Sequence, residues 1–203
     1  MLIGFKRMKV QTFDKDGKPD GELIVVEGNE NEGATQELSV EGLSKDPTKV
    51  SGSDIAYYIS QKGTGDVSGT VTALDLPVEA EARMLGKEML ETLKAYAIGD
   101  DTEPPYAAAT FESKDDQGDV AIFGFPMVRF SKNEASMKSL EDGEDFEPEG
   151  IEYGFSAISS KQKDETKGKV MLEFYGSPED AKVLEDKLFR KAGSAAPKSQ
   201  PSA

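Results

Sequence analysis

Carboxylates are the most concentrated chemical groups in this sequence, and one run of them could support acid–base chemistry. The segment 141–152 carries seven Asp or Glu side chains and no positive residue. A hydrolase that works through two carboxylates needs one acid in an apolar setting and another that stays ionised. Only Phe146 offers apolar surroundings here, and a block of like charges normally stays in water. The run therefore favours a solvated acidic loop, and a carboxylate-only hydrolase remains an alternative hypothesis.

A second group of acids could suggest a calcium loop. Asp14, Asp16 and Asp20 lie close together in the sequence. Counted from Asp14, however, Lys18 and Pro19 occupy the positions where an EF-hand needs an oxygen ligand and a glycine. The segment is better explained as a turn between two strands.

Other residue types that usually carry catalysis are missing. The chain contains no cysteine, histidine or tryptophan, which removes thiolate nucleophiles, Ser-His-Asp machinery and nearly all zinc chemistry. The glycines of the bend 63–69 could suggest a phosphate cradle, but no Gly-Lys-Ser/Thr follows them. We therefore expect no catalytic residue, no cofactor-binding residue and no metal ligand, and we predict that the protein is not an enzyme.

The overall charge limits the possible partners. The 203 residues include 24 Lys and Arg against 39 Asp and Glu, a net charge of −15. So acidic a chain repels phosphate backbones, although DNA could still slide past it without sticking. No apolar run approaches the roughly 20 residues of a membrane span. The N-terminal ten residues lack the apolar core of a signal peptide, so we expect synthesis in a cytoplasm and no membrane partner.

Alternating apolar residues and turn signals predict a mainly β chain. The expected strands cover residues 3–13, 22–27, 34–40, 67–74, 106–113, 120–132, 151–159 and 169–175. Neighbouring strands separated by short turns should pair as hairpins, including 151–159 with 169–175.

Two segments carry the start signals of helices. Pro77 opens the first, whose apolar face would hold Val78, Ala82, Leu85 and Met89, and Gly86 either interrupts this helix or is tolerated within one that reaches Lys94. Ser177 and Pro178 open the second, which should end near Ala192 with Gly193 as its cap. We expect one domain over residues 1–192 and a disordered tail over 193–203.

The segment that organises the chain is the long connection 42–66. Long connections in compact domains are usually functional or disordered, and the tyrosines and isoleucines here argue against disorder. We expect a short β segment inside it, with exposed aromatic and backbone groups that could join subunits. A proline cannot donate to a sheet ladder, so Pro126 should mark an edge or a bulge where chains meet. The candidate contacts between subunits are Ile55, Tyr57, Tyr58, Ile59 and Pro126.

Six runs of sequence, taken in order, carry a family resemblance. They are GFKRM, AYYISQKGTGDV, LDLPVEAEARMLG, EPPYAAATFES, VRFSKNEASMKS and EPEGIEYGFSAISS. Together they span about 4–175 of the chain, which resembles the major tail protein of long-tailed, siphovirus-type bacteriophages. The similarity rests on order and extent rather than on catalytic motifs.

The resemblance implies a mainly β fold, a tail-tube-like β-sandwich or β-barrel with one or two α-helices packed on it, that assembles with itself. Family members form hexameric rings that stack into a hollow tube, surround a tape-measure protein and meet tail-end proteins. DNA passes through the lumen during ejection without specific binding. The implied location is the virion tail, with assembly in the bacterial host cytoplasm. By analogy, the connection 42–66 is the candidate stacking loop.

One further hypothesis comes from the tyrosines. An acidic β-sandwich could hold a ligand such as a carbohydrate on patches formed by Tyr57, Tyr58 and Tyr106. A protein of this class would bind sugar without self-association, whereas a tube subunit would assemble.

Overall fold

The computed structural model describes residues 1–139 and 147–190, and antiparallel strands dominate it. One eight-stranded sheet has the order β2-β1-β9-β10-β11-β6-β3, with β12 also paired to β10. Its strands are β1 (Leu2–Phe13), β2 (Pro19–Val26), β3 (Ala34–Glu41), β6 (Ser68–Leu74), β9 (Ala107–Asp115), β10 (Val120–Ser131), β11 (Ile151–Ala157) and β12 (Leu172–Gly176). Two helices, α1 (Val78–Leu85) and α2 (Pro178–Leu188), pack on it, which confirms the predicted mainly β class.

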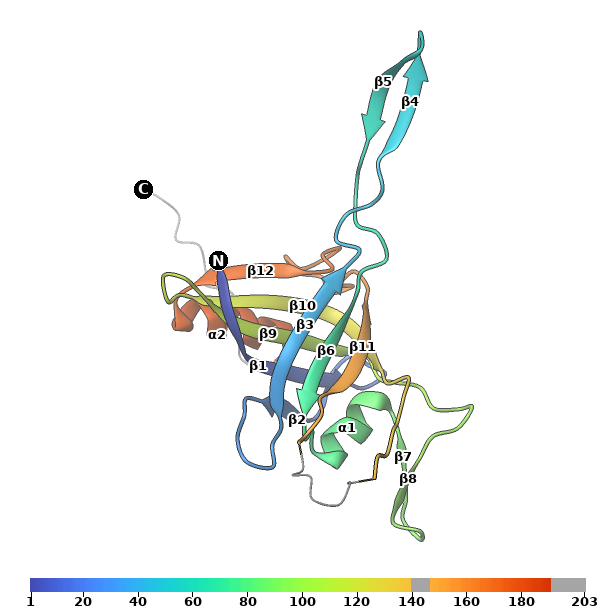
Figure 1. Cartoon of the computed structure of the whole chain (residues 1–203), viewed down its shortest axis with the longest axis vertical. Helices are drawn as coiled ribbons and strands as arrows, with labels where there is room; N and C mark the ends of the chain where they lie inside the picture. Colours follow the sequence, from blue (N-terminus) through green and yellow to red (C-terminus); the bar gives the residue numbers. More distant parts are fainter. Residues whose placement is uncertain (140–146, 191–203) are drawn as a thin grey trace.

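The sheet curls so that its two ends approach each other. Figure 1 shows β3 and β6 crossing in front of β1 and β9. The Thr35 hydroxyl of β3 donates a hydrogen bond to the Phe5 carbonyl oxygen of β1 at 2.9 Å. The two halves therefore enclose one core, as in a sandwich or an incompletely closed barrel.

The long strand β10 produces much of this curvature. Its first part, 120–124, pairs with β12, and its last part, 128–131, pairs with β11 on the same side. Between them the register with β9 shifts from Phe125 to Val128. Pro126 lies in this shift and is buried. The predicted bulge is confirmed, but β10 is an interior strand, so the alternative of an edge at Pro126 was wrong.

Aromatic side chains fill the core enclosed by the sheet. Phe111, Phe125 and Phe155 form a mutual cluster with ring centroids 5.2 to 5.8 Å apart. Such pairs add about 0.5–1.5 kcal/mol each beyond the area that they bury. Met84 and Leu85 bring α1 into the same core. A smaller cluster, formed by Phe13, Ala108, Leu188 and Phe189, packs the end of α2 on the sheet.

The first helix ends at a position that requires glycine. Gly86 has φ 68°, and a Cβ there would lie 2.4 Å from the Glu103 carbonyl oxygen. The helix therefore stops at Leu85. The predicted apolar face is correct for Ala82 and Leu85, but Val78 is 67% exposed.

The second helix begins as predicted and ends earlier. The Ser177 hydroxyl accepts a hydrogen bond from the Asp180 backbone N–H at 3.2 Å. The helix finishes at Leu188 with Phe189 as its C-cap. An end near Ala192 was therefore wrong, because the buried Phe189 turns the chain into the core first.

One predicted hairpin was also wrong. Strand β12 pairs with β10 and not with β11. After β11, the Ser160 backbone N–H donates to the Lys169 carbonyl oxygen at 2.8 Å, which closes a loop of its own. The Ile158 N–H meanwhile donates to the Met127 carbonyl oxygen. These bonds hold the loop beside the middle of β10 and direct β12 to the first half of β10.

Two predicted regions lie partly or wholly outside the described residues. They are the first part of the acidic run 141–152, and the C-terminal tail 193–203 with Gly193.

Candidate assembly surfaces

The connection 42–66 folds into a projecting hairpin. Its strands are β4 (Thr48–Gly52) and β5 (Ile55–Ser60), so it contains two paired strands where one was predicted. Ser53 and Asp54 form the turn with φ of 52° and 60°, and positive φ at both central residues is typical of a tight type I′ turn. The pairing then skips Tyr57, which leaves this residue at a bulge.

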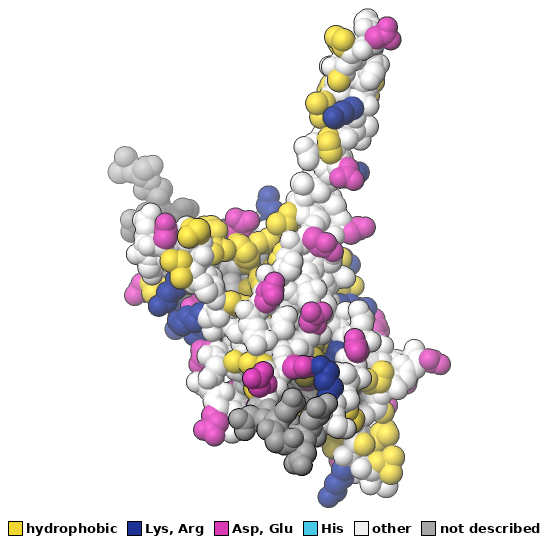
Figure 2. Space-filling view, viewed as in Figure 1, with side chains coloured by type: hydrophobic (Ala, Val, Ile, Leu, Met, Phe, Trp, Pro, Cys, Tyr) yellow, Lys and Arg dark blue, Asp and Glu magenta, His cyan; other side chains and the backbone are white. Residues whose placement is uncertain are grey.

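The hairpin exposes apolar side chains along its length. Tyr57 is 81% exposed and Ile55 63%, and Val50, Tyr58 and Ile59 are each more than half exposed. Figures 1 and 2 show the ribbon standing away from the sheet with hydrophobic side chains along it. The four predicted contact residues of this segment therefore lie together on one exposed element, and Pro126 does not join them.

Close backbone contacts hold the two stems of the hairpin. The Gly65 N–H donates to the Gly42 carbonyl oxygen at 2.9 Å, and the Gln61 side-chain amide donates to the Lys45 carbonyl oxygen at 3.0 Å. Gly42 has φ 74°, and a Cβ there would lie 2.2 Å from the Asp66 carbonyl oxygen. Only glycine allows this approach, so Gly42 fixes where the hairpin leaves the sheet.

We expect Gly42→Ala to loosen the base of the hairpin. The left-handed backbone alone costs about 1–2 kcal/mol for a residue with a Cβ, and the contact with Asp66 adds to it. Gly63→Ala is the matched control, because Gly63 also has positive φ, at 92°, but open space around it. Hydrogen exchange should be faster at the stem amides in the Gly42 variant than in the control. Equal exchange in both would show that the close approach is unimportant.

A second exposed hairpin lies at the opposite end of the molecule. It contains β7 (Glu88–Leu90) and β8 (Ala95–Ala97), which follow α1 directly. Leu93 and Ile98 are 71% and 73% exposed, and Met89 is 40% exposed. The sequence did not predict these strands, since three-residue strands carry almost no alternation signal. Figure 2 shows hydrophobic side chains gathered at this tip.

A third surface is a groove of about 300 Å³ between β1 and β3. The apolar side chains that line it are Leu2, Phe5, Leu38, Phe111, Ala121 and Phe123. It opens where the first part of β1 lacks a partner on one side, because β2 pairs only with residues 8–13. The groove thus marks the place where the curled sheet fails to close.

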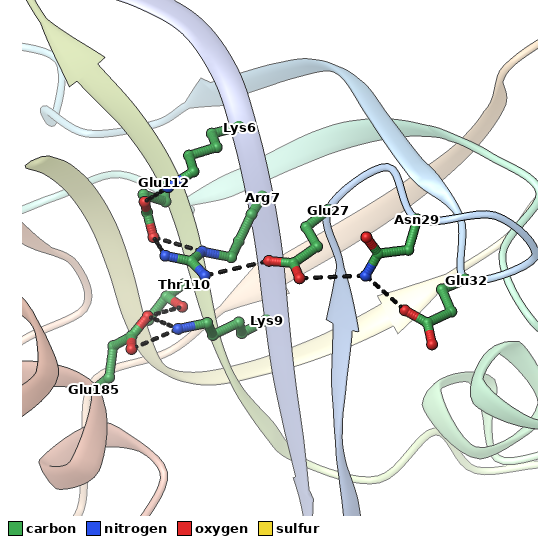
Figure 3. Close-up of polar contacts among 9 residues, drawn as sticks. All are labelled: Lys6, Arg7, Lys9, Glu27, Asn29, Glu32, Thr110, Glu112 and Glu185. Carbon is green, nitrogen blue, oxygen red and sulfur yellow. Dashed lines mark hydrogen bonds and ion pairs between the residues drawn. The ribbon is translucent and has the colours of Figure 1, made fainter.

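The buried acids Glu112 of β9 and Glu185 of α2 are engaged with cations. The Arg7 guanidinium donates to Glu112 at 2.7 Å and to Glu27 at 3.2 Å, and Lys6 also donates to Glu112 (Figure 3). Lys9 donates to both carboxylate oxygens of Glu185, at 2.7 and 2.8 Å. Burial alone would lower the pKa of Arg7, but the hydrogen bond and charge of Glu112 raise it above its ordinary value.

This network is suited to holding elements together rather than to catalysis. It joins β1 to β9 and to Glu27, the residue that follows β2, and the pair Lys9–Glu185 attaches α2 to the sheet. A general acid needs an apolar setting that keeps its proton. Glu112 and Glu185 each lie against a cation instead, so neither resembles such an acid.

A further ion-pair cluster attaches α1 to the sheet. Glu81 accepts hydrogen bonds from Lys87, from Tyr153 at 2.7 Å and from Lys132 at 3.2 Å. Burial would raise the pKa of Glu81, but these hydrogen bonds outweigh it and lower the pKa below its ordinary value. Burial, followed by the hydrogen bond to this carboxylate, raises the pKa of Tyr153.

The structure does not assemble the other predicted sites. Tyr106 lies just before β9 with the Arg129 guanidinium 4.1 Å from its ring centroid, separate from the tyrosines of the projecting hairpin. Of the acidic run, the described part includes Glu149, which is exposed and paired with Lys138 at 2.7 Å.

Within the described ranges, no group of three or more acids is arranged to hold a metal ion, and no helix is long and apolar enough to cross a membrane.

Comparison with known proteins adds one finding. The search of curated proteins found no match. A family model described as phage tail tube protein matches residues 5–144, from β1 through β10 and beyond it.

Proposed function

The chain belongs to the phage tail tube protein family, and on that premise we propose that it forms hexameric rings that stack into the tail tube of a siphovirus-type phage. The observation that carries the proposal is the β4–β5 hairpin, which exposes five large apolar side chains on a projecting element. Exposed apolar surface of this kind marks interaction sites. Here we assign it to the contact between rings.

Charge supports this assignment. Identical copies that each carry −15 repel one another, so their contacts are most favourable where charge is low. Residues 48–60 contain one Lys and one Asp and are neutral overall. The hairpin is therefore a part of the chain that can approach a second copy with little electrostatic cost.

The size of the hairpin explains why a ring is needed. A stable interface buries about 800 Å² on each partner, whereas a fully buried aromatic side chain contributes about 150–250 Å². One hairpin with two tyrosines is a weak contact alone. A ring presents several hairpins at once, and linked contacts strengthen one another through effective concentration.

The acidic composition suits a conduit for DNA. A wall rich in carboxylates repels phosphates, so DNA would pass during ejection without specific binding. The proposal places the protein in the virion tail, assembled in the bacterial host cytoplasm, with the tape-measure protein inside the tube and tail-end proteins at its limits. Its role is structural and requires no catalytic residue or cofactor.

Electron microscopy of the purified chain at high concentration tests the proposal. We expect rings or hollow tubes of uniform width. A parallel sample should contain the tail-end proteins of the same phage, since a tube can require an initiator. Monomers in both samples, by microscopy and by sedimentation, would contradict the proposed function.

A further inference from the structure

Two apolar elements project from opposite ends of the molecule. The β4–β5 hairpin extends from the end of the sheet where β3 finishes, and the β7–β8 hairpin lies at the far end beside α1 (Figure 1). Among the large hydrophobic side chains at the far end, Leu93, Ile98 and Val78 are each at least two-thirds exposed. Each element therefore presents apolar side chains that the described part of its own chain does not cover.

The opposite placement determines which contacts can be repeated. In a stack where every copy has the same orientation, an element that projects from one end meets the opposite end of the next copy. Such a contact is heterologous, because it joins two different surfaces, and it continues from copy to copy without closing. A contact between two β4–β5 hairpins would instead be two-fold symmetric and would end with a dimer.

Both elements carry charges of both signs. The β4–β5 hairpin carries Lys49 and Asp54, and the far end carries Glu88, Glu91 and Lys94, all of them exposed. Within the part of the chain that the structure describes, none of these five side chains takes part in an ion pair. Each element can therefore offer both signs of charge to the other at its polar rim.

The far end is also held in place well enough to act as a receptor. The Gly86 cap fixes where the chain leaves α1, against the Glu103 carbonyl. Glu103 in turn pairs with Arg129 of β10 at 2.6 Å. In the loop after β8, the Gly99 N–H donates to the Thr102 hydroxyl at 2.8 Å. These contacts reduce the ordering that binding would require.

We propose that the β7–β8 hairpin, together with the exposed Val78 of α1, is the acceptor surface for the β4–β5 hairpin of a second copy in the next ring. The inference rests on the proposed function, because it assumes stacking with one orientation. The groove between β1 and β3 is the competing acceptor. It is less suitable because part of its apolar lining, including Phe111 and Ala121, is already buried in the single chain, whereas Leu93 and Ile98 are exposed.

Cysteine cross-linking between two single variants tests the inference. The chain contains no cysteine, so every disulfide must come from an introduced residue. Ser51→Cys and Thr92→Cys, which change exposed polar residues of the two hairpins and keep their apolar side chains, are prepared separately, mixed under assembly conditions and oxidised. We expect covalent dimers in the mixture and none in either variant alone. Ser51→Cys mixed with Leu2→Cys, whose side chain lines the groove, is the matched control.

The outcomes separate the two proposals. Tubes with dimers only in the 51–92 mixture support the acceptor surface. Tubes with dimers in the 51–2 mixture, or in Ser51→Cys alone, overturn the acceptor and leave the proposed function standing. Tubes that give no disulfide in any mixture overturn the acceptor as well. If the wild-type chain forms no tubes even with tail-end proteins, the proposed function fails and the inference fails with it.

Discussion

Replacing Tyr57 and Tyr58 by serine is expected to raise the concentration needed for assembly by about 100-fold or more. Complete burial of a large apolar side chain is worth about 1.5–3 kcal/mol, and each 1.4 kcal/mol changes an equilibrium constant tenfold. Both tyrosines are more than half exposed in the single chain, so their loss should leave the subunit fold intact. Sedimentation across a concentration series measures assembly, and thermal unfolding measures the fold.

Val183→Ser provides the control for lost apolar surface. Val183 lies on α2 and is 62% exposed, close to the 57% of Tyr58, but it belongs to none of the three candidate surfaces. Its substitution should change neither assembly nor stability. If the control impairs assembly as much as the tyrosine pair does, the hairpin is not the specific contact.

Glu81→Gln is expected to lower the free energy of unfolding by about 2–4 kcal/mol near neutral pH. The variant removes a carboxylate that is 12% exposed and leaves the ammonium groups of Lys87 and Lys132 without their anion. Breaking a buried ion pair from one side costs several kcal/mol because the remaining charge stays desolvated. Urea unfolding compares the variant with the wild-type chain.

The same substitution should change the pH dependence of stability. The folded pKa of Glu81 lies below its ordinary value of 4.5, so its contribution is complete above that pH and is lost as pH falls through the folded pKa. The difference between wild type and variant should therefore shrink in acid. Glu79→Gln is the control, since Glu79 lies exposed on the same helix. A constant difference at every pH would contradict this role of Glu81.

Local patterns predicted most of the strands and both helix starts. The strand 120–132 contains enough β-branched and aromatic residues to be recognised, and Ser177 with Pro178 is a strong start signal. These features depend on neighbours in the sequence. The pairing partner of β12 does not depend on neighbours in the sequence. Strand β10 is long enough to pair with two strands on one side, and nothing in residues 169–175 indicates which half of β10 is available.

The two projecting hairpins were predicted only in part for a similar reason. The aromatic strand β5 was evident from its tyrosines and isoleucines, but its partner β4 has the polar sequence TKVSG. The turn between them is Ser53-Asp54 rather than the Asn-Gly pair that usually marks such turns. The β7–β8 end was missed because its exposure depends on where Gly86 stops α1, and periodicity could not decide between a stop and a continuing helix.

The isolation of the β4–β5 hairpin has a consequence for the timing of assembly. A two-stranded ribbon without a third strand or a packed face is only marginally stable in water. In a free subunit the hairpin should therefore open and reform, and binding to a neighbour would complete its folding. Two free subunits must order a hairpin for a single contact, whereas the end of a tube offers a ring of acceptors at once. Growth should then begin with a lag that preformed tube fragments abolish.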